Sequence, residues 1–131
     1  MKIQSGLYYD KDGREFRKMR NTSGGTLSVE TNGSLPVVRD VTATTVTTNG
    51  FLNGFTTTTS QDDRAVEGVL LHTTQNGQDA YILTKGLIRE AYGEQGLRVD
   101  GTTDIALGDD LATFTSAGVA GKATTGKGCI F

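Results

Sequence analysis

The chain of 131 residues has the length of one domain, enough for a single hydrophobic core. Its formal charge of −2 gives no reason to expect nucleic acid as a partner, and its one cysteine excludes an internal disulfide. A run of about 18 apolar residues and the apolar stretch of a signal peptide are both missing. We therefore expect a soluble protein that is made in the cytoplasm and has no membrane partner.

Glycine and threonine are prominent in the composition, and this indicates a β protein. The chain has 18 glycines, one proline and no tryptophan. Threonine suits a pleated strand, and glycine supplies the positive φ of tight turns, so we expect short strands and many turns. The predicted fold class is all-β, a small β-barrel or β-tulip-like domain with an extended N-terminal arm.

The first segment, residues 1–20, is basic and aromatic. It carries a net charge of +3, against −5 for the remainder of the chain. The turn-forming "DKDG" and the residues before it hold too few apolar side chains to fold alone. Glu15–Asn21, "EFRKMRN", alternates basic residues with others, which is typical of an exposed strand or an extended arm. We expect an arm over residues 1–20 and a single β-barrel-like domain over residues 21–131.

This arm is the main candidate for a binding function, because such a segment can become ordered on a partner surface. Its aromatic side chains would be apolar anchors, and its arginines would pair with carboxylates of the partner. The candidate binding residues are Tyr8, Tyr9, Arg14, Phe16, Arg17, Lys18 and Arg20. A solvated or disordered N-terminus is the alternative. Nucleic acid is a weaker partner, because the acidic body would be repelled by phosphates.

The first half of the domain contains strand patterns separated by turn signals. Strands are predicted over residues 26–30, Leu35–Val41 and 55–59, and Pro36 favours an edge or the start of a strand. Two Asn-Gly pairs, Asn49-Gly50 and Asn53-Gly54, predict hairpin turns.

The second half begins with Ala65–Thr73, which has the pattern of a buried strand. The turn "QNGQD" leads into Ala80–Tyr92, where the pattern predicts a strand, a break at a glycine and another strand. One or two helical turns are the alternative near Tyr92. The remaining predicted strands are Thr102–Ile105, Leu111–Thr115, Val119–Ala123 and Cys129–Phe131.

The triplet Gly108-Asp109-Asp110 has a composition that can hold a divalent metal. A two-metal site needs further carboxylates from other elements, and a polymerase needs a much longer chain. Glycine and aspartate also suit tight turns, because the aspartate side chain bonds nearby backbone N–H groups. We therefore interpret the triplet as the hairpin turn between strands that end at Leu107 and begin at Leu111.

A second motif, "GKATTGKG", nearly matches a phosphate-binding loop. Gly121, Gly126 and Lys127 have the required spacing, but Gly128 stands where the motif needs serine or threonine. The pattern after it also shows no helix whose N-terminus could face a phosphate. We interpret this stretch as a loop that joins two strands.

The single histidine and the single cysteine are the remaining candidates for a catalytic or metal-binding site. His72 cannot form a histidine-based zinc site by itself, and it is interpreted as a residue at a strand end. Cys129 is interpreted as a small buried hydrophobe, because no basic partner is indicated for a reactive thiol. We expect no catalytic residue, no metal and no cofactor.

Five stretches follow one another in a characteristic order over roughly residues 21–131. They are "NTSGGTL", "VVRDVTATT", "FTTTTSQDDRAVEGVLL", "AYILTKGLIREA" and "TTDIALGDDLATFTSAGVAGKATTGKG". In this order of glycine turn, valine-rich strand, threonine tract and hairpin, the chain resembles the capsid decoration proteins of tailed bacteriophages. These are also called cement or head-stabilisation proteins.

The resemblance implies a virion structural protein that is not an enzyme. Its compact β domain, often trimeric, would bind the outer capsid surface and clamp neighbouring major capsid protein subunits, with terminal arms extending across the shell. The expected partners are the major capsid protein and further copies of the chain, with a trimer favoured and synthesis in the host bacterial cytoplasm. A virion fibre, spike or carbohydrate-binding β module, in which the loops rather than the arm bind, is the alternative. Threonine tracts such as Thr56–Thr59 are equally typical of such modules.

Overall fold

The structure is a computed structural model of the chain, and it describes residues 2–4, 7–30, 33–40, 53–61, 63, 65–101, 105–106 and 109–123. Within these residues the regular structure is β, apart from one 3₁₀ turn, η1 (Glu90–Tyr92). The strands are β1 (Lys2–Gln4), β2 (Leu7–Tyr9), β3 (Glu15–Asn21), β4 (Leu35–Arg39), β5 (Asn53–Thr56), β6 (Val66–Leu70), β7 (Asp79–Lys85), β8 (Leu111–Thr113) and β9 (Ala120–Lys122).

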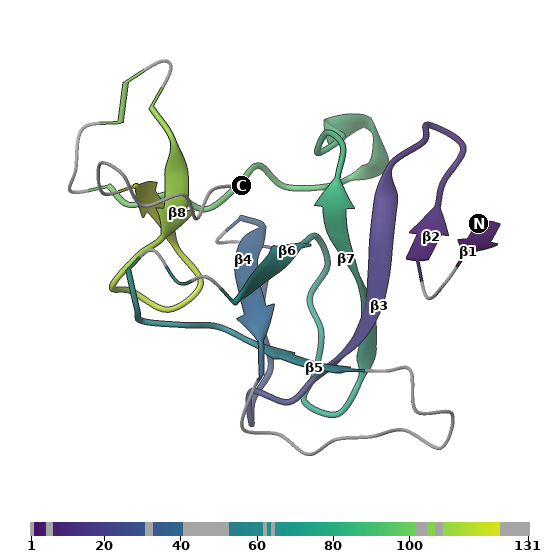
Figure 1. The fold of residues 1–131 in the computed structure, drawn as a ribbon, viewed down its shortest axis with the longest axis horizontal. Helices are drawn as coiled ribbons and strands as arrows, with labels where there is room; N and C mark the ends of the chain where they lie inside the picture. Colours follow the sequence, from purple (N-terminus) through teal and green to yellow (C-terminus); the bar gives the residue numbers. More distant parts are fainter. Residues whose placement is uncertain are drawn as a thin grey trace.

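Five of the described strands close into a barrel (Figure 1). They follow the order β3-β5-β4-β6-β7, and β7 pairs back with β3. β3 and β5 run parallel, whereas every other neighbouring pair in this ring is antiparallel. The ring confirms the predicted fold class, all-β with a small β-barrel.

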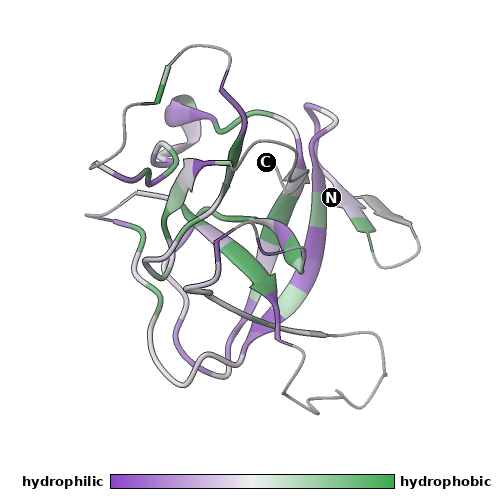
Figure 2. Ribbon diagram, turned by 60° about the vertical axis from the view of Figure 1, so that its left-hand side comes forward, coloured by the Kyte–Doolittle hydropathy of each residue, from purple (hydrophilic) through white to green (hydrophobic). Residues whose placement is uncertain are grey.

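The two faces of β3 contribute to two separate apolar cores, because successive side chains of a strand point in opposite directions. Met19 lies inside the barrel with Phe55, Leu70 and Ile82. Phe16 lies on the other face, where its buried neighbours are Val69, Leu71 and Leu83. Hydrophobic segments accordingly follow the barrel strands (Figure 2). Burial of these side chains is the main source of stability for the fold.

A two-stranded ribbon, β8 and β9, lies beside the barrel, on the opposite side from β1 and β2 (Figure 1). Two parallel bridges link the ribbon to the residue before β4 through the segment that follows η1. Ala120 of β9 pairs with Val99, and Leu97 pairs with Ser34. The hydroxyl of Thr113 in β8 donates to the carbonyl of Ser60 at 2.9 Å. These contacts hold the ribbon against the loop that follows β5.

The structure corrects the expected boundary between the arm and the domain. Glu15–Asn21 is the strand β3, paired with both β5 and β7, and it belongs to the barrel rather than to an arm over residues 1–20. The basic composition suggested exposure. However, the strand also carries Phe16 and Met19, which lie on opposite faces, and each face is covered by its own core.

Three local expectations were wrong in the described residues. Asn53-Gly54 lies inside β5 rather than in a turn, because Gly54 is packed so closely that a Cβ there would lie 2.6 Å from the hydroxyl of Thr22. The predicted strand over residues 26–30 is reduced to one bridge, Leu27 with Thr74. The predicted second strand after Gly86 is replaced by η1, the helical alternative.

Other local expectations are confirmed. The turn "QNGQD" connects β6 to β7, and Gly77 within it has a φ of 82°. Pro36 lies in the part of β4 that pairs with β6 and is not matched to β5, as expected for a residue without an N–H. Asn49-Gly50, residues 102–104 and Cys129–Phe131 lie outside the described residues.

Candidate functional site

The N-terminal hairpin, which consists of β1 and β2, projects from the barrel beside β3 (Figure 1). β2 pairs with β3 in antiparallel fashion, with Tyr8 opposite Phe16. β1 pairs with β2 and stands at the end of the strand order, so among the described strands it has a partner on one side only. Its outer edge offers backbone groups to a further strand.

The three aromatic candidates of the predicted arm make contacts within the chain itself. The ring of Tyr8 packs edge to face against Tyr81, with 5.0 Å between ring centroids and an interplanar angle of 75°. The hydroxyl of Tyr9 donates to Glu15 at 3.0 Å, and Phe16 is buried. Hydrogen bonds from Thr84 and Tyr9 lower the pKa of Glu15. These aromatic side chains therefore fasten the hairpin and β3 to the barrel.

Arg14 is the most completely bonded of the basic candidates. Its Nη1 and Nη2 donate to the two carboxylate oxygens of Glu94 at 2.7 and 3.1 Å, and its Nε donates to Asp10 at 2.7 Å. Nη1 also donates to the carbonyl of Leu87 at 3.1 Å. We call Asp10, Arg14 and Glu94 the Arg14 cluster. It ties the turn before β3 to the segment that follows β7.

The carboxylates of the Arg14 cluster are held in their charged form. Burial alone would raise the pKa of Glu94, but hydrogen bonds from Arg14 and from the amide of Arg89, together with the Arg14 charge, lower it overall. Asp10 follows the same pattern: burial opposes ionisation, whereas bonds from Arg14 and from the Asp12 amide lower its pKa. The hydrogen bonds of Glu94 and Asp10 raise the pKa of Arg14.

The remaining basic candidates lie on β3, and two of them form ion pairs within the chain. Arg17 contacts Glu67 at 3.4 Å, and Arg20 contacts Asp79 across the β3–β7 ladder at 2.8 Å. Lys18 is half-buried and stands opposite Tyr81. Carboxylates of the same chain thus bind Arg14, Arg17 and Arg20, whereas their pairing with carboxylates of a partner stays a prediction.

A groove opens where β6 and β7 separate. Their ladder ends at the pair Leu70–Ile82, after which the chain leaves β7 and Thr74 pairs with Leu27 through two backbone hydrogen bonds of 2.9 and 3.0 Å. The space between the two segments has a volume of about 420 Å³. We call it the Tyr81 groove. It is lined by Asp10, Arg14, Phe16, Leu70, Leu71, His72, Thr73, Thr74, Gln78, Asp79, Ala80, Tyr81 and Glu94.

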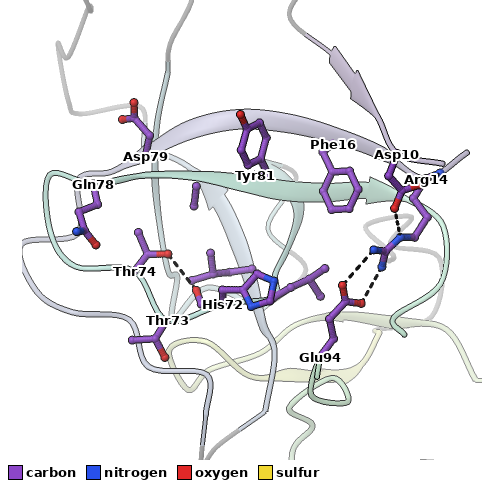
Figure 3. A pocket seen from close by; sticks show the side chains of 13 residues that line it. Asp10, Arg14, Phe16, His72, Thr73, Thr74, Gln78, Asp79, Tyr81 and Glu94 are labelled. Atoms are coloured by element: carbon purple, nitrogen blue, oxygen red, sulfur yellow. Dashed lines mark hydrogen bonds and ion pairs between the residues drawn. The ribbon is translucent and has the colours of Figure 1, made fainter. Parts of the chain in front are cut away.

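The lining residues surround this groove in an ordered way (Figure 3). Tyr81 and Phe16 lie along the β7 side, and His72 lies across from them. Arg14 and Glu94 stand together at one end, and Gln78 stands at the other. The predicted arm residues Arg14 and Phe16 are thus brought to one site, together with residues from two later segments.

The contacts of Asp109 within the described residues are with Ala106 and with Lys122 on the neighbouring strand β9. Its side chain accepts a hydrogen bond from the amide of Ala106 at 2.8 Å and contacts Lys122 at 3.2 Å. The hydrogen bond from the Ala106 amide, followed by that from Lys122, lowers the pKa of Asp109. Asp109 and Asp110 immediately precede β8, whereas Leu107 and Gly108 lie outside the described residues. Two of the three residues of the triplet are thus described, and the amide of Asp109 donates to the carbonyl of Ala106 at 3.1 Å, as in a turn.

The first glycine of "GKATTGKG" lies in a strand. Gly121 is the central residue of β9, and a Cβ there would lie 2.5 Å from the ring of Phe114. Residues 124–131, including Cys129, lie outside the described residues. His72 is exposed and lies two residues beyond the end of β6, so the expectation of a strand-end residue is confirmed.

Sequence reasoning did not find Glu94, Tyr81 or Gln78. Glu94 stands in a glycine-containing stretch that has the pattern of a polar turn, and nothing local connects it with Arg14. Tyr81 follows the period of a strand, so the pattern alone assigns it no further role. The spacing of Asp10 and Arg14, four residues apart, is the one local signal for the Arg14 cluster.

Comparison with known protein families, with curated proteins and with solved structures finds no match for this chain. In the described part of the chain, no helix has the length and apolar character needed to cross a membrane. The described His, Cys, Asp and Glu side chains also form no group of three or more that could hold a metal ion.

Proposed function

We propose that this chain is a virion structural protein, a capsid decoration protein of a tailed bacteriophage. It binds the outer capsid surface and stabilises the shell by clamping neighbouring major capsid protein subunits, without catalysis. The order of motifs over residues 21–131 supports the proposal, as does the all-β barrel. The observation that carries it is the N-terminal hairpin, which places a strand edge outside a ring of strands.

A closed ring of strands has no edge, because each strand has two neighbours. The barrel from β3 to β7 is such a ring, whereas β1 has a described strand partner only in β2. An extended segment of a coat subunit can add to an edge of this kind through backbone hydrogen bonds, largely independently of sequence. In this proposal β1 replaces the long basic arm as the contact element.

Interactions within the chain hold the base of the hairpin in place and so favour this contact. The Arg14 cluster fixes the turn before β3, and β3 itself, on which the hairpin is built, pairs with β5 and β7. A rigid hairpin loses little conformational entropy on binding, which favours affinity. Several copies arranged symmetrically, with a trimer favoured, would multiply a weak edge contact through avidity.

Mixing the purified protein with undecorated phage heads and imaging the particles tests the proposal. We expect regular density on the outer surface of the shell. Heads that stay bare at every protein concentration would refute it. Light scattering on the free protein tests the proposed trimer separately.

A truncation tests the role of the edge. A variant without residues 1–6 loses β1 but keeps β2 and the barrel, and we expect it to decorate heads much more weakly. The matched control is Val99→Ala, an exposed apolar residue near β9, which should decorate normally. Equal decoration by the truncated variant would show that β1 is not the contact element.

A further inference from the structure

The Tyr81 groove has the size and the rigidity of a preformed ligand site. Small-molecule sites have volumes of about 300–1,000 Å³, and this groove measures about 420 Å³. One wall is β7, held by β3, and the other is fixed by the paired hydrogen bonds between Thr74 and Leu27. Size alone does not identify the groove as a ligand site, because a second cavity of about 430 Å³ lies near Gly68.

The aromatic lining distinguishes the Tyr81 groove from this second cavity. The second cavity is lined by Val66, Glu67, Gly68, Val69, Leu83, Thr84, Lys85, Gly86 and Ile88, none of which is aromatic. In the groove, Tyr81 is 42% exposed, and Tyr8 packs against its ring edge to face. An exposed aromatic ring held in one orientation attracts the C–H groups of a ligand through its electron-rich face.

The charges of the lining are already balanced within the protein. Asp10 and Glu94 bond to Arg14, and Asp79 bonds to Arg20 from the neighbouring strand. The guanidinium of Arg14 also lies 5.1 Å from the Phe16 ring centroid, so the face of that ring is occupied. A charged ligand would have to compete with these pairs, which favours a neutral ligand.

Several polar groups of the lining keep unused hydrogen-bonding capacity. The carbonyl oxygen of the Gln78 side chain accepts from the Gln75 amide, which leaves its NH₂ group as a donor. Thr73 accepts from the amide of Val29 and retains its hydroxyl proton. His72 is exposed, and only one oxygen of Asp79 bonds to Arg20. The groove thus offers both donors and acceptors.

We propose that the Tyr81 groove binds a neutral saccharide. A sugar ring combines an apolar C–H face, which stacks on Tyr81, with hydroxyl groups that both donate to and accept from Gln78, His72 and Asp79. This activity differs from capsid binding through β1, because the groove lining contains no residue of β1, although Tyr8 of β2 packs against Tyr81. It gives the protein a second ligand.

Titration of the ¹⁵N-labelled protein, followed by amide chemical shifts, tests this inference. The probes are maltose, lactose and N,N′-diacetylchitobiose, with N-acetylneuraminic acid as the charged comparison. We expect at least one neutral disaccharide to produce saturable shifts at Tyr81, Gln78 and His72, with a Kd of roughly millimolar magnitude. If none of the three does so, the inference is overturned. It is also overturned if coat protein shifts these amides and the saccharides do not.

Substitutions at one position separate stacking from an indirect effect. Tyr81→Ala should weaken binding about tenfold, whereas Tyr81→Phe keeps the ring and should retain most of it. Tyr92→Ala is the matched control, because Tyr92 is 43% exposed but lies outside the lining. An amide spectrum of each free variant verifies the fold. Normal binding by a folded Tyr81→Ala variant would overturn the inference.

Discussion

Arg14 and Glu94 are separated by 80 residues in sequence and form a buried ion pair through two hydrogen bonds. Their side chains are only 7% and 4% exposed. Gly86 packs against Arg14 so closely that a Cβ at Gly86 would lie 2.7 Å from the Cγ of Arg14. The turn before β3 and the segment after β7 are therefore fixed to each other by one guanidinium group.

Replacing Arg14 should strongly destabilise the protein. Arg14→Met removes three hydrogen bonds to carboxylates and leaves the charge of Glu94 buried without its partner, which costs about 3 kcal/mol of unfolding free energy. Urea denaturation measures this change. Arg20→Gln is the control, because its pair with Asp79 is partly exposed and should be worth less than about 1 kcal/mol. Equal effects of the two substitutions would contradict a special role for Arg14.

Stability should fall in acid because of the same cluster. The pKa of Glu94 and that of Asp10 are both lower in the folded protein than their ordinary values of 4.5 and 3.8. A lowered folded pKa contributes stability above the unfolded pKa, and this contribution is lost as the pH falls through the folded pKa. Urea midpoints measured from about pH 7 down to pH 3 should drop below about pH 4.5. Glu94→Gln should reduce this dependence, and an unchanged slope would contradict the assignment.

Gly68 should tolerate no side chain. It pairs with Val37 in the barrel, and a Cβ there would lie 2.1 Å from the carbonyl oxygen of Leu83. Gly68→Ala should therefore cost about 2 kcal/mol or more, because the β6–β7 contact must open. Gly96→Ala is the control: nothing lies within 4 Å of its Cβ position, so its unfolding free energy should change by less than about 0.5 kcal/mol.

The buried side chain of Asn21, the last residue of β3, should contribute strongly to the free energy of unfolding. Its side chain is fully buried and donates to the carbonyls of Gly25 and Thr74 at 3.0 and 2.9 Å. Asn21→Ala leaves these carbonyls without that donor and should cost about 2–4 kcal/mol, as measured by thermal or urea unfolding. Ser23→Ala removes a partly buried hydroxyl from the same turn, and its cost should be about 1 kcal/mol or less.

Two N-terminal deletions should differ sharply in stability. Removing residues 1–6 takes away β1, which is not part of the barrel ring, so the unfolding free energy should change by less than about 1 kcal/mol. Removing residues 1–20 takes away most of β3 and should abolish cooperative unfolding. Circular dichroism during thermal denaturation distinguishes the two results. A cooperative transition in the longer deletion would mean that β3 is dispensable.

Local patterns in the sequence predicted the strands better than their arrangement. The alternation in Glu15–Asn21 predicted an extended segment with the bounds that β3 has, and "QNGQD" predicted its turn. The Asn-Gly signal at Gly54 was wrong, because the close approach of Thr22 also requires glycine. Glycine can thus be required either by a tight turn or by close packing, and only the tertiary contact shows which of the two applies at Gly54.

The candidate site was less predictable than the strands, because its residues come from distant segments. Nothing in the sequence near Glu94 specifies Arg14 as its partner. The Tyr81 groove exists because the β6–β7 ladder stops at Leu70–Ile82, and the length of a ladder depends on the competing pairing of Thr74 with Leu27. The sequence shows which residues are basic, but the carboxylates that pair with them could be assigned only once the pairing of the strands was known.

The position of β3 in the barrel also has a consequence for synthesis on the ribosome. β3 is translated before any of its barrel neighbours, and Asp79, which pairs with Arg20, follows 59 residues later. At about 5–20 residues per second, the nascent strand waits roughly 3–12 s for β7. Phe16 and Met19 have no native strand pairing to β7 during that interval, so their apolar side chains stay open to non-native contacts until β7 has been translated.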